Sequence, residues 1–540
     1  MGPERVRLRQ LFFCALFLSG FLLLFTQIKT TANLYDEGLV LTNAERVRAG
    51  ELPYRDFWTM YGPGYFYALA GLFLLVEPTI LAARLFDTVL RFLLTLKVYL
   101  LARTVTSSWV ALIPYAFVTF WLATIRFYSY PAFPATGALL LAALAFTGYL
   151  RDRRGRWLFL SGMALGLTAL LRLDFGGYGA FGFAVALALL ELRESSILRD
   201  AWRVRLGRLL KVELLTAAGA LLVALPLYGY LLVASGWATV YDVLIVFPAT
   251  VFPAFRRLPV PPLFADFGQL SGLQWNDWLR LYIPLGIYAV AIVVSLRWLR
   301  LGRLSASDRR PAIAVLLLAL TGTGLGLVVK ATSRYHDLHV LPTTICASIV
   351  ATALLYRIPR NVWRNTPFQV GFAGLAFLFL TGPYVAHFHM LTVYGPTSPR
   401  LCYSQLPRAG CVLVNHDVER VAQYLQANTR VNEYVFVGNS RHDLIFVNDL
   451  LIHFLADRPS PTRYTELHPG LATTLPVQEA IANELAEKDV QWVVIMHGWE
   501  SQEPNASSIS SGVTFLDDYL RERYMPDTTF GSYQVWRRAP

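Results

Sequence analysis

The sequence predicts an α-helical polytopic membrane protein of about eleven transmembrane helices, followed by an extracytoplasmic α/β domain. Three observations support this fold class. The 540 residues are 55% hydrophobic and only 16% charged, whereas soluble domains contain about 25% charged residues. Apolar runs close to the ~20 residues needed to cross a bilayer core recur along the chain. The basic residues lie in short clusters between those runs, which is how membrane topology is encoded.

The apolar runs predict eleven membrane helices. Residues 1–32 have the basic start and apolar middle of a signal peptide, but no small-x-small site follows directly. We therefore interpret the first run as an anchor helix. A shorter apolar segment, 64–76, is expected to lie at the interface or dip into the membrane. The predicted helices cover residues 11–28, 79–102, 109–125, 133–150, 157–171, 177–192, 212–235, 282–299, 312–329, 338–356 and 368–385.

Lysine and arginine predict the orientation. With the N-terminus inside, the inner segments contain 22 basic and five acidic residues, whereas residues 386–540 contain 12 basic and 17 acidic residues. An excess of basic residues marks cytoplasmic loops. We therefore expect a multi-pass protein of the cytoplasmic (inner) membrane, whose first outer loop 29–78, outer loop 236–281 and C-terminal domain lie outside. The net charge of +12 forms no compact patch with stacking aromatics, so we expect no nucleic-acid partner.

The chain changes character near residue 386, where a transmembrane domain (1–385) ends. Alternating apolar stretches at Glu433–Val437 and Gln491–Ile495 predict strands, and Val477–Lys488 predicts a helix between them. Residues 386–540 therefore read as a separate extracytoplasmic α/β domain. Cys402 and Cys411, nine residues apart, could form a disulfide in an oxidising compartment, and no cysteine spacing matches a zinc site.

The segment Asn33-Leu34-Tyr35-Asp36-Glu37-Gly38 places two adjacent carboxylates where the first helix is expected to leave the membrane. One interpretation is that Asp36 and Glu37 are solvated residues that cap a helix from Gly38 to Ala49. The other is a general base that takes a proton from an acceptor hydroxyl at the membrane surface. In that case Glu37 raises the pKa of one of the pair, or the two divide base and metal duties.

Two further groups lie on the predicted outer side. The stretches Leu52-Pro53-Tyr54-Arg55-Asp56-Phe57 and Tyr61-Gly62-Pro63-Gly64-Tyr65 suit either a groove-forming interfacial loop or an ordinary aromatic belt. Arg172 and Asp174 lie at the outer end of a helix, and ionisable groups at membrane depth are costly and tend to be functional. They can pair with each other or with residues of the second helix, namely Arg84, Asp87 or Arg91.

A cation-rich segment precedes the helix predicted at 338–356. Lys330, Arg334, His336 and His339 are four potential cations within ten residues, beside hydroxyls, which makes a phosphate site plausible. A solvated loop is the alternative interpretation. Arg256 and Arg257 are weaker candidates of the same type.

Several familiar motifs are missing from the sequence. It has no P-loop, no dinucleotide fingerprint and no serine nucleophile elbow. The carboxylates, aromatics and candidate phosphate cations are all expected outside, where no nucleotide sugar is supplied. An activated group would therefore have to arrive attached to a lipid phosphate.

On these residues the chain resembles the C-type superfamily of membrane glycosyltransferases, which use polyprenyl-phosphate sugars. Within it, the chain is similar to the branch of protein O-mannosyltransferases and lipid A aminoarabinose transferases. The resemblance covers roughly residues 10–350 in pattern. It is carried by Tyr35–Gly38, Gly50–Phe57 and Tyr61–Gly64, with Arg84 and Arg334–His339 as further family positions.

The resemblance implies an inverting glycosyltransferase that moves a sugar from a polyprenyl-phosphate donor to an acceptor hydroxyl on the outer face. Asp36 would be the base, and Glu37 would support it or orient the acceptor. We expect donor-phosphate contacts from Arg334, Lys330, His336 and Arg84, and substrate contacts from Tyr35, Tyr54, Asp56, Tyr61, Arg172, Asp174 and His339. No cofactor is expected, and a divalent metal is not favoured. The expected partners are the donor, a glycan, lipid or protein acceptor, and the lipid bilayer.

Two other functions fit parts of the pattern. A membrane transporter or flippase of lipid-linked or small substrates is the main alternative, although the two halves show no repeat. An outer-face transferase of acyl or phosphoethanolamine groups would need His-Asp or metal-ligand pairs, for which His336, Asp337 and His339 are the candidates.

Overall fold

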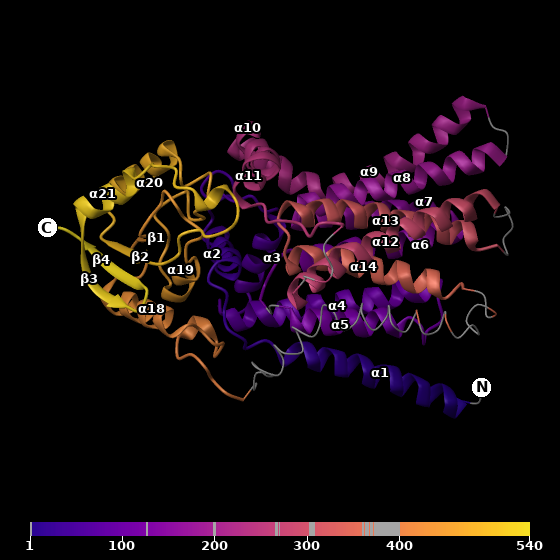
Figure 1. The fold of residues 1–540 in the computed structure, drawn as a ribbon, viewed down its shortest axis with the longest axis horizontal. Coiled ribbons are helices and arrows are strands. Elements are labelled where there is room, and N and C mark those ends of the chain that lie inside the picture. Colours follow the sequence, from indigo (N-terminus) through magenta and orange to yellow (C-terminus); the bar gives the residue numbers. More distant parts are fainter. Residues whose placement is uncertain are drawn as a thin grey trace.

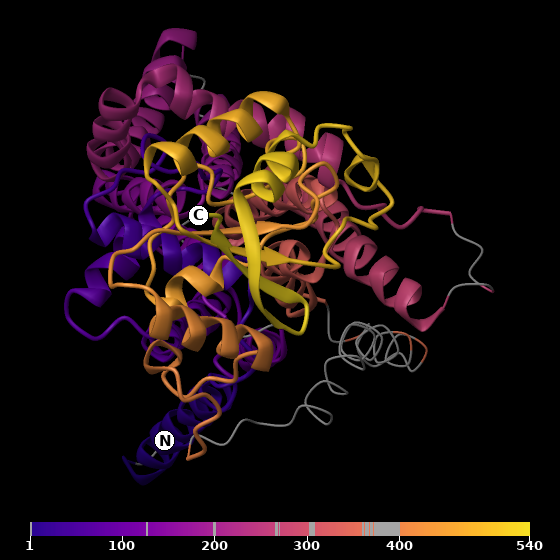
Figure 2. The ribbon, with the colours of Figure 1, turned by 90° about the vertical axis from the view of Figure 1, so that its left-hand side faces the viewer.

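The structure is a computed structural model that describes residues 3–125, 128–197, 201–264, 271–301, 308–358 and 400–540, with a few isolated positions between these ranges. A bundle of long helices carries the C-terminal domain against one of its ends, and the N-terminus lies at the opposite end (Figure 1). Seen from the C-terminal domain, the small sheet lies in front of the bundle (Figure 2).

Helices occupy each of the first ten predicted spans, and the eleventh, 368–385, lies outside the described residues. Eight helical segments in the described ranges are long and apolar enough to cross a membrane, judged by length and composition. The bundle helices are α1 (Pro3–Phe25), α4 (Ile80–Val105), α5 (Leu112–Thr124), α6 (Ala132–Asp152), α7 (Gly155–Leu171), α8 (Leu173–Ile197), α9 (Trp202–Ser235), α12 (Gly272–Leu301), α13 (Arg310–Ser333) and α14 (Asp337–Leu355).

Two shorter helices, α2 (Asp36–Arg48) and α3 (Gly64–Phe73), form within the predicted first outer loop. The middle of α2 is buried, including Leu39, Val40 and Leu41. These side chains belong to the main hydrophobic core. Helix α2 is therefore buried within the molecule, and it is not a solvated helix that Asp36 and Glu37 merely cap.

The predicted outer loop 236–281 contains several helices that the sequence did not predict. It contains α10 (Trp237–Tyr241), the π-helix η1 (Asp242–Val251) and α11 (Phe252–Arg256) before α12 begins. Pro248 and Pro253 interrupt the apolar pattern and hid the helices, but Pro253 sits in the first turn of α11, where its missing N–H has no intrahelical partner to lose. Phe247 of η1 packs on Trp58 of the first outer loop.

The C-terminal domain is a four-stranded sheet, with strand order β1-β2-β4-β3, surrounded by helices. β1 and β2 pair in parallel and are buried along their whole length, and they confirm both predicted strands. Cys402 and Cys411 form a disulfide ahead of the sheet. The elements are η2 (Pro407–Ala409), α18 (His416–Asn428), β1 (Val435–Asn439), α19 (Leu451–Ala456), α20 (Leu475–Glu487), β2 (Trp492–Met496), η3 (Ala506–Ser508), α21 (Phe515–Arg523), β3 (Tyr524–Phe530) and β4 (Tyr533–Arg538).

Main-chain hydrogen bonds join the C-terminal domain to the first outer loop. The N–H of Ala32 donates to the carbonyl of Leu413 at 2.8 Å, and the N–H of Trp58 donates to the carbonyl of Arg463 at 2.9 Å. Arg408 also pairs with Glu45 of α2 at 3.1 Å. Since backbone pairing tolerates little displacement, the domain and the loop form one continuous structure at this end of the bundle.

Candidate active site

Asp36 lies in the first turn of α2, and Asn33 caps that turn. The Oδ1 atom of Asn33 accepts hydrogen bonds from the N–H groups of Tyr35 (3.0 Å) and Asp36 (2.7 Å). The Asp36 side chain is therefore not needed as the cap. Its Oδ2 instead accepts a hydrogen bond from the Tyr128 hydroxyl at 2.8 Å. A helix N-terminus favours the ionised carboxylate that a general base requires.

Glu37 faces away from Asp36 into the bundle, where it pairs with Arg84 of α4. Two parallel bonds of 2.7 Å join the carboxylate to the guanidinium, and both side chains are 0% exposed. The other N–H groups of the Arg84 guanidinium donate hydrogen bonds to the carbonyls of residues 28, 30 and 31. Arg84 and Glu37 are thus the two members of one buried ion pair. Their expected roles, a donor-phosphate contact for Arg84 and support of the base for Glu37, stay predictions.

A second buried ion pair on α4, Asp87 with Arg91, holds the backbone of Tyr128 in position. Tyr128 was not predicted as a site residue from the sequence. Arg91 donates to Asp87 at 2.6 Å and to the carbonyl of Tyr128 at 2.9 Å. The ring of Phe133 lies 4.4 Å from the same guanidinium. The charges of Asp87 and Arg91 at membrane depth are visible in the sequence and indicate a special site. Nothing in the sequence, however, connects them to the Tyr128 backbone.

Arg172 and Asp174 pair with each other rather than with α4. The guanidinium of Arg172 holds both Asp174 oxygens at 3.0 and 2.7 Å and lies 5.4 Å from the ring of Tyr61. Tyr61, Tyr130 and Asp36 lie within electrostatic reach of one another and of Arg172. Burial raises the pKa of Tyr61 well above its usual value, so its hydroxyl is a proton-bearing donor beside Asp36.

The predicted phosphate cations meet a glutamate of the C-terminal domain. Arg334 donates to Glu503 through two nitrogens, at 2.9 and 2.5 Å, and Arg256 lies 3.5 Å from the same carboxylate. Burial opposes ionisation of Glu503, but the hydrogen bond from Arg334 and the charges of both arginines lower its pKa below the usual value. Lys330 lies 5.4 Å from the ring of Phe252 and within electrostatic reach of Asp174.

The two histidines of the cation-rich segment take part in the turn before α14. His336 is the N-cap residue, and its Nδ1 accepts from the N–H of Leu338 at 3.4 Å. His339 Nδ1 lies 2.6 Å from the carbonyl of Arg334. Of the predicted phosphate ligands, Arg334 and Lys330 are gathered with Arg256, while the described ring contacts of both histidines are to backbone.

Tyr54 and Asp56 build the first outer loop instead of lining a groove. Tyr54 is completely buried with a positive φ of 70°, and its hydroxyl donates to the Tyr61 carbonyl at 2.8 Å. Asp56 accepts from the N–H of Leu52 at 2.7 Å and pairs with Arg55. The hydrogen bond from Arg55 lowers the pKa of Asp56. Both side chains therefore hold the loop in shape, and their expected substrate contacts stay a prediction.

Tyr35 contacts a buried histidine and glutamate of the C-terminal domain. Its hydroxyl lies 2.5 Å from His468 Nε2, and Glu466 Oε2 lies 3.7 Å from the same nitrogen. Burial lowers the pKa of His468 to about 3 and raises that of Glu466 to about 8. His468 is therefore neutral at physiological pH, and its Nε2 shares a hydrogen bond with the Tyr35 hydroxyl. Sequence reasoning missed both residues because isolated charged residues in a water-facing domain carry no periodic signal.

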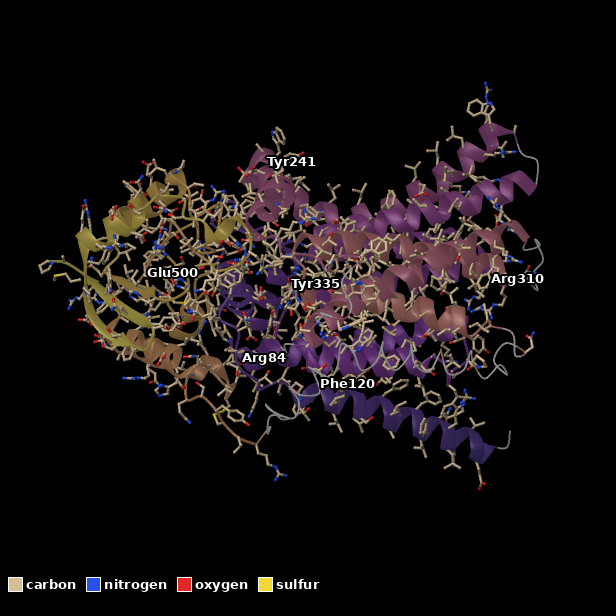
Figure 3. All side chains as sticks on the ribbon, in the orientation of Figure 1. Arg84, Phe120, Tyr241, Arg310, Tyr335 and Glu500 are labelled. Atoms are coloured by element: carbon tan, nitrogen blue, oxygen red, sulfur yellow. A yellow bond between two sulfur atoms is a disulfide. The ribbon has the colours of Figure 1, made fainter. Side chains whose placement is uncertain are left out.

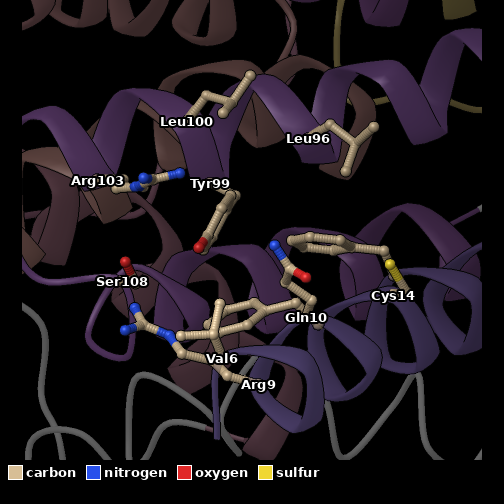
Figure 4. A pocket seen from close by; sticks show the side chains of 11 residues that line it. Val6, Arg9, Gln10, Cys14, Leu96, Tyr99, Leu100, Arg103 and Ser108 are labelled. Atoms are coloured by element: carbon tan, nitrogen blue, oxygen red, sulfur yellow. The ribbon is translucent and has the colours of Figure 1, made fainter. Parts of the chain in front are cut away.

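These groups collect at one end of the bundle. Figure 3 labels Arg84 and Tyr335 at the end that meets the C-terminal domain, and Arg310 at the opposite end. A cavity between α1 and α4 is lined by Phe13, Leu96, Tyr99, Arg9 and Arg103 (Figure 4). Its α1 residues belong to the N-terminal part of that helix, whose N-terminus lies at the opposite end of the bundle (Figure 1). In the described ranges no three His, Cys, Asp or Glu side chains converge as metal ligands.

Comparison with known structures finds a similar fold in other solved proteins. ArnT from Cupriavidus metallidurans bound to undecaprenyl phosphate superposes with a TM-score of 0.54 at 14% identity, covering 97% of this chain and 97% of that one. Apo ArnT from the same organism also gives 0.54 at 14% identity, covering 99% and 98%. The archaeal oligosaccharyltransferase AglB from Archaeoglobus fulgidus gives 0.49 at 13% identity, covering 90% and 70%.

No protein-family model matches the sequence, and no curated protein matches it. The likeness to ArnT extends over nearly the whole of both chains, so it includes the C-terminal domain. The chain therefore has an ArnT-like fold: a bundle of long apolar helices with a small C-terminal sheet domain. The resemblance stated from the sequence motifs is confirmed at the level of fold.

Proposed function

We propose that the protein is an inverting glycosyltransferase that moves a sugar from a polyprenyl-phosphate donor to an acceptor hydroxyl at the outer face of the cytoplasmic membrane. The observation that carries this proposal is the juxtaposition of a carboxylate and a group of cations. Asp36 and Arg256 lie within electrostatic reach of each other. Arg334 in turn shares the Glu503 carboxylate with Arg256. One group can accept a proton while the others stabilise a phosphate that becomes more negative as it departs.

The charge balance of this cluster favours an anionic ligand. Arg256 and Arg334 share the Glu503 carboxylate. Lys330 lies beside the Phe252 ring and within electrostatic reach of Asp174, which is already paired with Arg172. With Arg172 and Asp36 counted, the group therefore has four cations and three carboxylates. Partly buried cations that outnumber their carboxylates are stabilised by a bound anion. A polyprenyl phosphate supplies that anion at the end of an apolar chain that suits the bilayer. ArnT, whose fold this chain shares, has been solved with undecaprenyl phosphate bound.

In the proposed reaction Asp36 takes the proton of the acceptor hydroxyl as its oxygen bonds to the anomeric carbon. The bond from that carbon to the donor phosphate oxygen breaks, and polyprenyl phosphate leaves with the electron pair. Attack opposite the leaving group inverts the anomeric carbon. Tyr128 holds one oxygen of Asp36, which limits rotation of the base in its first helical turn.

The test is transfer by purified protein from synthetic polyprenyl-phosphate sugars, followed as free polyprenyl phosphate. Mass spectrometry of cell-envelope lipids and glycans from cells with and without the gene identifies the sugar and the acceptor to supply in this assay. Asp36→Asn should lower turnover by a factor on the order of 100 or more, the usual contribution of a general base. Asp518→Asn is the matched control because Asp518 is exposed and its described side-chain partners, Arg521 and the Thr514 hydroxyl, both belong to the α21 segment.

Two results would contradict the proposal. Turnover of Asp36→Asn equal to that of the wild type would remove the base assignment. Movement of lipid-linked substrate across the bilayer without release of polyprenyl phosphate would instead indicate a transporter.

A further inference from the structure

Helix α2, which carries Asp36, is held between the two parts of the molecule. On one side Glu37 is anchored by Arg84 of the bundle. On the other side the face formed by Gly38, Thr42 and Arg46, spaced four residues apart, meets the C-terminal domain. The Thr42 hydroxyl donates to the Leu450 carbonyl at 3.0 Å, and Arg46 donates to the Thr462 carbonyl at 2.9 Å.

The closest approach is at the turn that contains Asp36. A Cβ atom added to Gly38 would lie 2.4 Å from the backbone nitrogen of Leu451 and 2.8 Å from the carbonyl carbon of Leu450. The N–H of Leu451 in turn donates to the carbonyl of Leu34 at 3.1 Å. The backbone start of α19 therefore lies directly on the first turn of α2, and only glycine allows that distance.

Two adjacent side chains of this turn are held by opposite partners. The Tyr35 hydroxyl is hydrogen-bonded to His468 of the C-terminal domain, while Asp36 accepts from Tyr128 of the bundle. His468 is itself enclosed by Trp58, with ring centroids 5.6 Å apart, and by Phe252, at 6.2 Å. The Tyr35–His468 contact is available only when the C-terminal domain is packed in place.

We propose that the C-terminal domain is a working part of the active site, in which the Leu450–Leu451 backbone and His468 position the catalytic turn of α2 so that Asp36 faces its substrate. This inference rests on the proposed function, in which Asp36 is the base. His468 and Leu451 are positioning residues, because they act on Asp36 through Tyr35 and Gly38. A displacement of about 1 Å at a reacting group can cost a factor on the order of 100 in rate.

The first experiment compares Gly38→Ala with Gly71→Ala in the purified full-length protein. Gly71 lies on the neighbouring α3, where an added Cβ meets nothing within 4 Å. Gly38→Ala should lower kcat by about 10- to 100-fold and leave the Kd for polyprenyl phosphate within about twofold, because the donor cations lie on other elements. Gly71→Ala should leave both unchanged. Wild-type kcat in a folded Gly38→Ala protein would overturn the inference.

The second experiment is a double-mutant cycle between Tyr35 and His468, which keeps the inference testable if Gly38→Ala does not fold. Tyr35→Phe and His468→Leu should each lower kcat by about tenfold, and the double variant should be no slower than either, because one shared contact is lost. His468→Gln keeps an acceptor and should restore most of the rate. Wild-type kcat in His468→Leu, or independent, additive losses, would overturn the inference.

The two proposals fail in different ways. Full activity of Asp36→Asn removes the base, and the positioning role falls with it. An inactive Asp36→Asn protein beside fully active Gly38→Ala and His468→Leu proteins leaves the proposed function standing and removes only the role of the C-terminal domain. Equal loss of polyprenyl-phosphate binding in these variants would show general damage to the site and would also contradict the positioning role.

Discussion

Two groups of charges at the same end of the bundle differ in how well they are matched. On α4, Arg84 pairs with Glu37 and Arg91 pairs with Asp87, and all four side chains are completely buried. In the outer cluster Arg256 and Arg334 share Glu503; the side chains of Arg334 and Glu503 are each 15% exposed, whereas Arg256 is buried. A fully buried charge is tolerated only with its own partner, so the first group is structural. A partly exposed group with more cations than carboxylates can still bind an anionic ligand. The charge balance of a group and its burial together therefore distinguish structural charges from those of a binding site.

The largest expected effect comes from breaking a matched pair. Glu37→Gln leaves the Arg84 charge buried without its carboxylate, and it should cost about 3–5 kcal/mol in the free energy of unfolding. Thermal unfolding in detergent measures this loss, with the exposed Glu487→Gln as control. Replacing both partners, as in Glu37→Leu with Arg84→Met, should recover most of the stability because no charge is then buried. Normal stability of Glu37→Gln would show that the pair is dispensable.

An intermediate effect is expected from the unmatched group. Arg334→Ala removes one charge-assisted contact to the donor phosphate and should raise the donor KM by about 10- to 100-fold, corresponding to about 1.5–3 kcal/mol. Turnover at saturating donor should change less. Arg310→Ala is the control because Arg310 is an exposed arginine at the opposite end of the bundle (Figure 3). A normal donor KM for Arg334→Ala, or unfolding as severe as that of Glu37→Gln, would place Arg334 with the structural charges.

The smallest effect is expected where the matched and unmatched groups meet. Tyr128 is held by Arg91 through its backbone and donates its hydroxyl to Asp36. Tyr128→Phe keeps the ring and loses one hydrogen bond to a charged group, about 1.5 kcal/mol or roughly a tenfold loss of kcat, with the donor KM unchanged. Tyr115→Phe controls for loss of a buried hydroxyl far from Asp36, because Tyr115 contacts α1. Equal kcat in the two variants would separate Tyr128 from catalysis.

The elements that the sequence predicts well are those with a local physical cause. Apolar runs of bilayer length predicted helices such as α6 and α13, and alternating apolar residues predicted β1 and β2. The 237–256 helices were missed because prolines broke the pattern. Asp36 and Arg334 were found because charges beside apolar runs are conspicuous. Tyr128, His468 and Glu503 were not, because each lies in a stretch whose local composition is ordinary.

The sequence by itself determined the bundle helices that are formed by uninterrupted apolar runs, where the charges lie along them, and that Asp36 and Glu37 stand together after the first helix. Only the tertiary structure decided what each carboxylate does. Successive residues on a helix point about 100° apart, so Glu37 turns into the bundle towards Arg84 while Asp36 meets Tyr128. The partner of Tyr35 lies 433 residues away in the chain. Such contacts depend on how the C-terminal domain packs on α2, and no local pattern in the chain encodes that packing.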